Sequence, residues 1–169
     1  MHKLVIVACA LAAAGLATAV EAQPAAAPAP AATEYVTIPL ETRVNAPADR
    51  AWAKIKGYCD IGAWLKTSCA ITSGKDGEVG AVRRIANRID EVLVSSTAWS
   101  YTYAQPKSPI DYHGTLEIRP DGPNASKLMY TLVYDAAGLP AGADKAADKA
   151  RRTTQFTGIL QTIKGIAEK

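Results

Sequence analysis

The sequence predicts an α+β domain in which consecutive antiparallel strands pack against one long C-terminal helix. Two patterns carry this prediction. Residues 139–169 place large apolar side chains at helical spacing on one face, namely Phe156, Ile159, Leu160, Ile163 and Ile166. Residues 80–134 instead alternate at period two, as strands with one covered face do. A curved sheet of about seven strands is therefore expected to share its core with the helix.

Residues 1–33 predict a targeting segment and a spacer. A short positive start precedes an uncharged, Ala-rich run, and Val20 and Ala22 are the small residues that a signal peptidase reads. We predict a signal peptide over residues 1–22 and a periplasmic or secreted location. A retained membrane anchor is the alternative, but a spanning helix needs about 20 strongly apolar residues. Residues 23–33, almost all Ala and Pro, predict a flexible linker before a domain over residues 34–169.

The elements of the domain follow from local signals. Residues 35–44 are β-prone, and Pro39 within them suits an edge strand. A helix is predicted to start near Asn45 with Pro47 in its first turn, and a second short helix covers residues 60–65. Asp144 is placed to cap the final helix. Between the short helices and the final helix, strands are predicted over residues 69–73, 80–87, 90–96, 97–105, 110–119 and 127–134.

Two cysteines remain after removal of the predicted signal peptide. Cys59 and Cys69 form an isolated pair in a small domain, which in an oxidising compartment favours a disulfide. A bridge across about ten residues stabilises a fold by about 2–3 kcal/mol. The alternative is two buried free thiols.

Charge and histidine content argue against several classes of protein. Lys and Arg number 19 against 16 Asp and Glu, and the basic residues are scattered, whereas a nucleic-acid binder concentrates them on one face. The predicted mature chain has one histidine, His113, on the uncovered side of its strand. One histidine and two cysteines make no zinc site, and no Ser/His/Asp set is apparent. We therefore expect neither a metal nor another cofactor, and no nucleic-acid partner.

Tyrosines recur on the side of the strands that is expected to be covered. Tyr101 and Tyr103 share a side with Trp99, and Tyr112, Tyr130 and Tyr134 lie on covered positions of later strands. A sheet that needed only a dry core would use Val, Ile and Leu. Each buried hydroxyl needs a hydrogen-bond partner or water. This requirement is met most easily when the sheet and the helix do not close completely, so the tyrosines predict a cavity.

Charged residues also fall on the covered side. Because neighbouring strand residues face opposite ways, either Arg83 or Arg84 points inward. Glu91, in the next strand, could meet Arg83 across the hairpin. A buried pair of this kind is either a structural brace or a polar anchor at the end of a pocket. The sequence leaves both interpretations open.

Several runs, taken in order, resemble a known superfamily. They are VNAPADRAW over residues 44–52, AWL over 63–65, GAVRR over 80–84 and SPIDY over 108–112. Their order and spacing resemble START/Bet v 1-like proteins, also called SRPBCC or polyketide cyclase/dehydrase-like proteins. The resemblance covers residues 34–167. It implies a helix-grip fold, in which the sheet wraps around the terminal helix and leaves a cavity between them.

The resemblance also implies a site. Members of this superfamily hold lipids, sterols, plant hormones and polyketides in the cavity, and a minority are enzymes. The hairpin over residues 91–101 is short, so a shallow pocket is expected. Carried over by position, the cavity wall comprises Trp64, Arg83, Ile85, Glu91, Tyr101, Tyr112, Tyr130, Phe156 and Leu160.

Three hypotheses for the function follow. The leading one is a periplasmic or secreted binding protein for a small hydrophobic or aromatic molecule. The second is a cyclase or dehydratase in which Tyr112 or Tyr130 is the general acid and Glu91 the base. The third is a structural or partner-binding domain with a closed core. A Glu91 locked to Arg83 would argue against the second hypothesis, and an open cavity would argue against the third.

Overall fold

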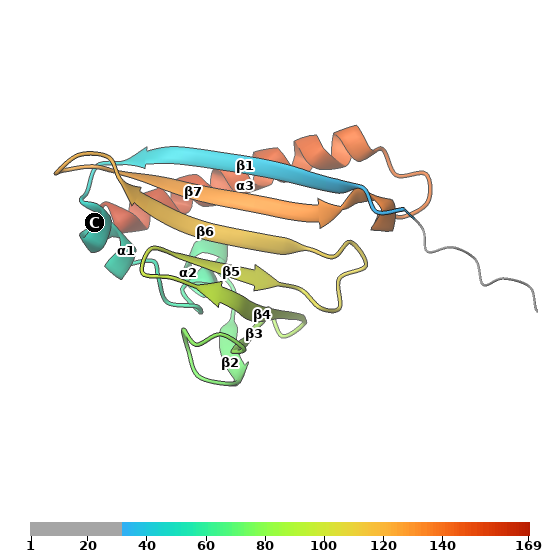
Figure 1. The fold of residues 1–169 in the computed structure, drawn as a ribbon, viewed down its shortest axis with the longest axis horizontal. Coiled ribbons are helices and arrows are strands. Elements are labelled where there is room, and N and C mark those ends of the chain that lie inside the picture. The colour runs from blue at the N-terminus through green and yellow to red at the C-terminus, as the bar shows by residue number, and fades with distance from the viewer. Residues whose placement is uncertain (1–31) are drawn as a thin grey trace, which may run out of the picture. The chain divides into compact units, whose positions relative to one another are not determined.

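The computed structural model describes residues 32–169, which form one antiparallel sheet crossed by a long helix (Figure 1). The predicted signal peptide and residues 23–31 of the predicted linker lie outside the described residues. The sheet has seven strands in the order β1-β7-β6-β5-β4-β3-β2. The strands are β1 (Tyr35–Val44), β2 (Cys69–Ser73), β3 (Val82–Ile85), β4 (Ile89–Ser96), β5 (Ser100–Ala104), β6 (His113–Pro120) and β7 (Ser126–Asp135).

The helices occupy the predicted places in the chain. Two short helices, α1 (Ala48–Ala53) and α2 (Ile61–Leu65), follow β1, and a 3-10 turn, η1 (Ala136–Gly138), follows β7. The final helix, α3 (Lys145–Ala167), runs behind the sheet in Figure 1. The predicted fold class, a curved antiparallel sheet gripping a C-terminal helix, is confirmed. Strand β1 is an edge strand, which explains how it accommodates Pro39.

Helix α3 begins and packs as its sequence indicates. The Asp144 carboxylate accepts hydrogen bonds from the backbone N–H groups of Ala146 and Ala147, at 2.9 and 3.0 Å. Leu160 and Ile163 are fully buried in the core. The other large residues of the apolar stripe, Phe156, Ile159 and Ile166, are partly buried against it. The middle of the stripe, at Leu160 and Ile163, therefore packs most closely against the core.

Strand limits differ from the prediction where the backbone turns. Strand β3 ends at Ile85 because Ala86 and Asn87 both adopt positive φ values, 50° and 57°, in a tight turn to β4. Strand β6 begins at His113 because Asp111, with φ of 43°, interrupts the extended chain. Such values are rare for residues with a Cβ, and alternation of apolar residues does not reveal them.

Two further expectations about single residues were wrong. Trp99 precedes β5 and is 38% exposed, so it does not share the covered side with Tyr101 and Tyr103. Trp99 lies in the turn between β4 and β5, where its backbone N–H donates to the Thr97 hydroxyl at 3.1 Å, although its carbonyl still accepts from the Ile118 N–H of β6 at 2.9 Å. Pro47 occupies the N-cap of α1 and not its first turn, with an extended ψ of 145°.

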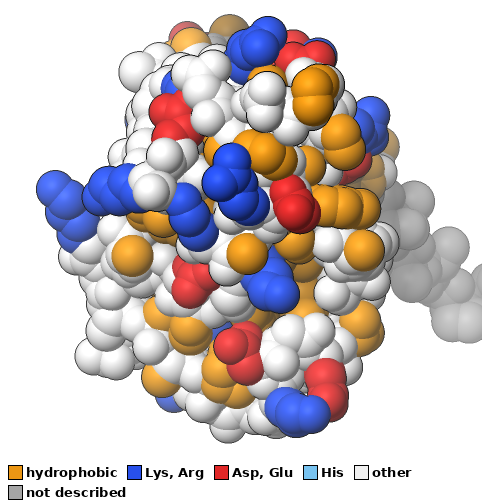
Figure 2. Space-filling model, turned by 90° about the vertical axis from the view of Figure 1, so that its left-hand side faces the viewer, with side chains coloured by type: hydrophobic (Ala, Val, Ile, Leu, Met, Phe, Trp, Pro, Cys, Tyr) orange, Lys and Arg blue, Asp and Glu red, His pale blue; other side chains and the backbone are white. Residues whose placement is uncertain are grey.

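The surface carries charges of both signs. On the face shown in Figure 2, the side chains of Lys and Arg are interspersed with those of Asp and Glu and with apolar groups. Within residues 32–169, no helix is both long enough and apolar enough to cross a membrane.

Replacing Lys66 with Gly is expected to stabilise the domain by about 0.5–1 kcal/mol. Lys66 ends α2 in the left-handed conformation, with φ of 51° and ψ of 49°, and its side chain is exposed. Glycine adopts this conformation without the steric cost of a Cβ. Urea unfolding should show a higher midpoint for Lys66→Gly than for the natural chain. Lys66→Ala retains the Cβ and should show no gain, so a gain in Lys66→Ala would contradict this explanation.

Candidate functional site

A cavity of about 220 Å³ lies between the covered face of the sheet and the N-terminal half of α3. Its lining is mainly apolar and comes from α2, the β3–β4 hairpin, the chain around β5 and β6, β7 and α3. Leu65 and Gln155 are exposed residues of the lining and mark its open side. The aliphatic part of the wall consists of Ile61, Leu65, Ile85, Ile89, Ile110 and Ile159.

Aromatic rings form the inner wall. The hydroxyl groups of Tyr103 and Tyr130 hydrogen-bond to each other at 2.6 Å. Phe156 packs edge-on against Tyr130, with ring centroids 5.3 Å apart, and lies 6.5 Å from the ring of Tyr112. Within the described residues, the buried hydroxyl of Tyr112 has no hydrogen-bond partner. Burial raises the pKa of Tyr103, Tyr112 and Tyr130 above the ordinary value, so all three hydroxyl groups are neutral.

The predicted Arg83–Glu91 pair exists and is buried. The Arg83 guanidinium donates from Nε to Glu91 Oε2 at 2.7 Å, and its Nη2 lies 2.5 Å from the same oxygen. Gln105 Nε2 donates to Glu91 Oε1 at 2.8 Å. Burial opposes the charge of Arg83 most strongly, but Glu91 and the surrounding tyrosines together outweigh this effect and hold the Arg83 pKa above its ordinary value. Both carboxylate oxygens of Glu91 are therefore engaged within the protein.

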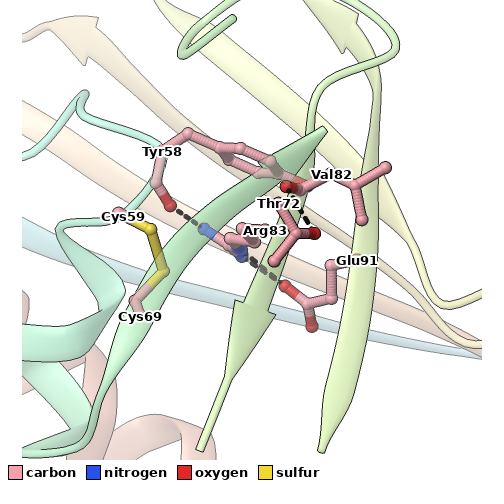
Figure 3. The surroundings of a disulfide bond; sticks show 7 residues. All are labelled: Tyr58, Cys59, Cys69, Thr72, Val82, Arg83 and Glu91. Atoms are coloured by element: carbon pink, nitrogen blue, oxygen red, sulfur yellow. Dashed lines mark hydrogen bonds and ion pairs between the residues drawn. A yellow bond between two sulfur atoms is a disulfide. The ribbon is translucent and has the colours of Figure 1, made fainter. Parts of the chain in front are cut away.

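A disulfide supports this pair from the other side. Cys59 and Cys69 are bonded, with Cα atoms 5.5 Å apart, so the pairing favoured by the sequence is present. The bond ties the loop after α1 to strand β2 (Figure 3). Tyr58 directly precedes Cys59, and its backbone carbonyl accepts a hydrogen bond from Arg83 Nη1. Figure 3 shows Arg83 held between this carbonyl and Glu91. These contacts favour the interpretation of the pair as a structural brace, and Glu91 also belongs to the cavity lining.

Positive charge gathers at one side of the cavity. Arg152 belongs to the lining and donates to Asp148 Oδ2 at 2.6 Å, and Arg151 donates to the other oxygen of Asp148 at 2.6 Å. Two guanidinium groups thus share one carboxylate. Burial acts to raise the pKa of Asp148, but the two arginine hydrogen bonds outweigh it and lower the pKa. Among residues 32–169, no group of three or more His, Cys, Asp or Glu is arranged to hold a metal ion.

The structure brings together five of the nine residues that the resemblance implied for the wall. These are Ile85, Glu91, Tyr112, Tyr130 and Phe156. Trp64, Arg83 and Leu160 are buried but do not belong to the lining. Helix α2 contributes Ile61 and Leu65, which are one turn apart, to the wall instead of Trp64. Helix α3 contributes Ile159 instead of Leu160. Arg83 lies behind Glu91.

The ninth residue, Tyr101, lines a second cavity of about 300 Å³. Trp52, Tyr58 and Leu93 supply further apolar surface there. Its polar groups come from the segment after α1, the β2–β3 loop and the β4–β5 turn with its strand ends, and they are Lys56, Asp76, Ser96, Thr97 and Ser100. Sequence reasoning found neither this cavity nor the contributions of Gln105, Ile110 and Arg152 to the first. Tyr103 could have been found, because it alternates with Tyr101 in the same strand.

A curved antiparallel sheet that grips a C-terminal helix and leaves a cavity between them defines a START/Bet v 1-like protein. Residues 35–165 match the family described as polyketide cyclase / dehydrase and lipid transport, and the chain belongs to this family. Family and fold together indicate a domain of the kind that binds hydrophobic ligands or acts as a cyclase or dehydrase. The sequence has no match among curated proteins.

Solved structures share the fold at low sequence identity. The aromatase/cyclase ZhuI from a Streptomyces species superposes with a TM-score of 0.62 at 19% identity, covering 80% of this chain and 94% of that one. A protein from Nitrosospira multiformis gives 0.63 at 19% identity, with 77% and 94% covered. Ara h 8.0201 gives 0.57 at 15% identity, with 79% and 98% covered. These likenesses show the fold alone.

Proposed function

We propose that the protein binds a small hydrophobic or aromatic molecule in the cavity between the sheet and α3. The observation that carries this proposal is the mainly apolar cavity of about 220 Å³, open at the exposed residues Leu65 and Gln155. Transfer of apolar surface from water into such a site contributes about 25 cal/mol per Å² buried. A few polar groups in an otherwise apolar wall are the usual composition of a small-molecule site.

The polar groups of the wall suggest one feature of the ligand. Tyr112 is 5% exposed, and its unpartnered hydroxyl is a hydrogen-bond donor in need of an acceptor. A carbonyl or hydroxyl oxygen on the ligand would supply one. Arg152 and Gln155 offer further donors toward the open side. We therefore expect an apolar body that carries at least one oxygen.

The same contacts favour binding over acid–base catalysis. Glu91 was the candidate base, but Arg83 and Gln105 occupy both of its carboxylate oxygens. A general base needs a free oxygen within reach of the proton that it removes. The third hypothesis, a closed core, requires side chains that fill the interior, and the cavity is at odds with this requirement.

We propose a periplasmic or secreted location for the domain. The Cys59–Cys69 bond supports this proposal, because disulfides persist mainly in oxidising compartments. The signal peptide over residues 1–22 and the linker over residues 23–33 remain predictions from the sequence.

Filling the cavity should abolish ligand binding. Ile159→Trp adds a large ring on α3 at a partly exposed position of the lining, where the helix can accept it. Titration calorimetry with para-butylphenol, an apolar aromatic probe with one hydroxyl, should show binding to the natural chain and at least about tenfold weaker binding to the variant.

Ile166→Trp is the matched control. Ile166 is partly buried on the same stripe of α3 but lies outside the lining, so its replacement should leave the affinity unchanged. The proposed function fails if the natural chain does not bind the probe. It also fails if Ile159→Trp binds the probe as tightly as Ile166→Trp does.

A further inference from the structure

The two cavities are neighbours along strands β4 and β5. Along β4, Glu91 lines the first cavity, and Leu93, two residues on, lines the second. Along β5 the order is matched, since Tyr103 lines the first cavity and Tyr101 the second. Leu93 pairs with Tyr103 in the sheet register. The two cavities are therefore separated by about one residue pair along these strands.

Arg83 fills the space between the cavities. Its guanidinium carbon lies 4.1 Å from the ring centroid of Tyr58, which lines the second cavity. It lies 4.8 Å from the ring centroid of Tyr103, which lines the first. The Arg83 side chain is completely buried and belongs to neither lining. The Arg83 guanidinium thus contacts an aromatic ring from each of the two linings.

The bonds around Arg83 hold its guanidinium in place. Glu91 binds it from β4, the Tyr58 carbonyl binds it from the loop after α1, and the neighbouring disulfide fixes that loop. Moving the guanidinium aside would break the ion pair and leave Arg83 and Glu91 as buried charges without counter-ions. An apolar chain that enters the first cavity therefore meets a barrier it cannot displace cheaply.

We propose that Arg83 is a partition that limits the length of the ligand, so that the first cavity accepts compact apolar molecules and excludes long chains from the second. This inference rests on the proposed function, since it concerns the ligand of the same cavity. It assigns Arg83 a role in specificity without contact to the ligand.

The test compares para-butylphenol with para-dodecylphenol in titration calorimetry. For the natural chain, we expect the longer probe to bind no tighter than the shorter one, because its extra methylenes remain in water. Arg83→Leu/Glu91→Leu removes both charges and joins the cavities. Each methylene that becomes buried strengthens binding about fourfold, so the preference of this variant for the longer probe should rise by at least about 30-fold.

A neighbouring ion pair supplies the matched control. Arg84 and Asp90 sit on the same two strands as Arg83 and Glu91, and Arg84 Nε lies 2.6 Å from Asp90 Oδ1 on the opposite face of the sheet. Arg84→Leu/Asp90→Leu should retain the length preference of the natural chain. The proposed partition would be overturned if the longer probe gained the same affinity over the shorter one in the natural chain and in both double variants.

Two further outcomes are decisive. If the natural chain binds neither probe, the proposed function fails, and the inference fails with it. If Arg83→Leu/Glu91→Leu does not fold, the amide NMR spectrum of the natural chain with para-dodecylphenol decides the matter. Shifts at Ile85 and Ile89 without shifts at Ser96 and Ser100 support the partition, whereas shifts at all four residues overturn it, because the last two line the second cavity.

Discussion

Replacing Glu91 alone with Leu is expected to destabilise the domain by about 3–5 kcal/mol. The change leaves the guanidinium of Arg83, a side chain with no exposed surface, without its counter-ion. Domains of this size unfold with about 5–15 kcal/mol, so the variant should lose a large part of its stability. Urea unfolding followed by circular dichroism measures this loss directly.

The double variant Arg83→Leu/Glu91→Leu should recover most of the lost stability, because apolar residues can replace a buried pair at little net cost. A double-mutant cycle over the two positions then reports their coupling. Asp90→Leu breaks the neighbouring pair, whose Arg84 is nearly half exposed, and should cost much less. If the natural chain and Glu91→Leu had the same urea midpoint, the stability cost of burying Arg83 would not depend on Glu91.

Alternation along a predicted hairpin was sufficient to place one of Arg83 and Arg84 on the covered face and to suggest Glu91 as a partner for Arg83. That inference needs only the two-residue period of a strand, which the sequence displays. The sequence could not decide between brace and anchor. The contacts that favour the brace come from the Tyr58 carbonyl in the loop after α1 and from Gln105 just after β5. Contacts between residues so far apart depend on the finished fold.

Part of the cavity wall was predictable. Ile85, Glu91 and Tyr130 of the strands and Phe156 of α3 were expected in it and belong to it. Ile110 reaches the wall from the loop before β6, whose course depends on the positive φ of Asp111. No periodic pattern encodes such a turn. On the helices, the spacing predicts the buried face but not which part of that face meets a cavity, so Ile159 lines the cavity while the more deeply buried Leu160 does not.

Gly138→Ala is expected to disturb the stability and the cavity together, because the loop before β6 packs directly on this glycine. A Cβ at Gly138 would lie 2.0 Å from the carbonyl oxygen of Pro109 and 3.1 Å from the Cα of Ile110. These are backbone atoms, which cannot rotate away as a side chain can. The loop is also held by the Asp135 N–H, which donates to the Ile110 carbonyl at 2.7 Å. We expect a loss of about 2–3 kcal/mol in the free energy of unfolding.

The displaced loop should also weaken para-butylphenol binding, because Ile110 and Tyr112 belong to the cavity wall. Gly158→Ala is the control, because it makes the same glycine-to-alanine change away from the loop. No atom lies within 4 Å of a Cβ at Gly158 on α3, so alanine should raise the stability there by about 0.5–1 kcal/mol and leave binding unchanged. A destabilised Gly138→Ala variant that still bound the probe with full affinity would show that the loop supports the fold without shaping the site. Tyr112 would then not be the hydrogen-bond donor to the oxygen that we expect on the ligand.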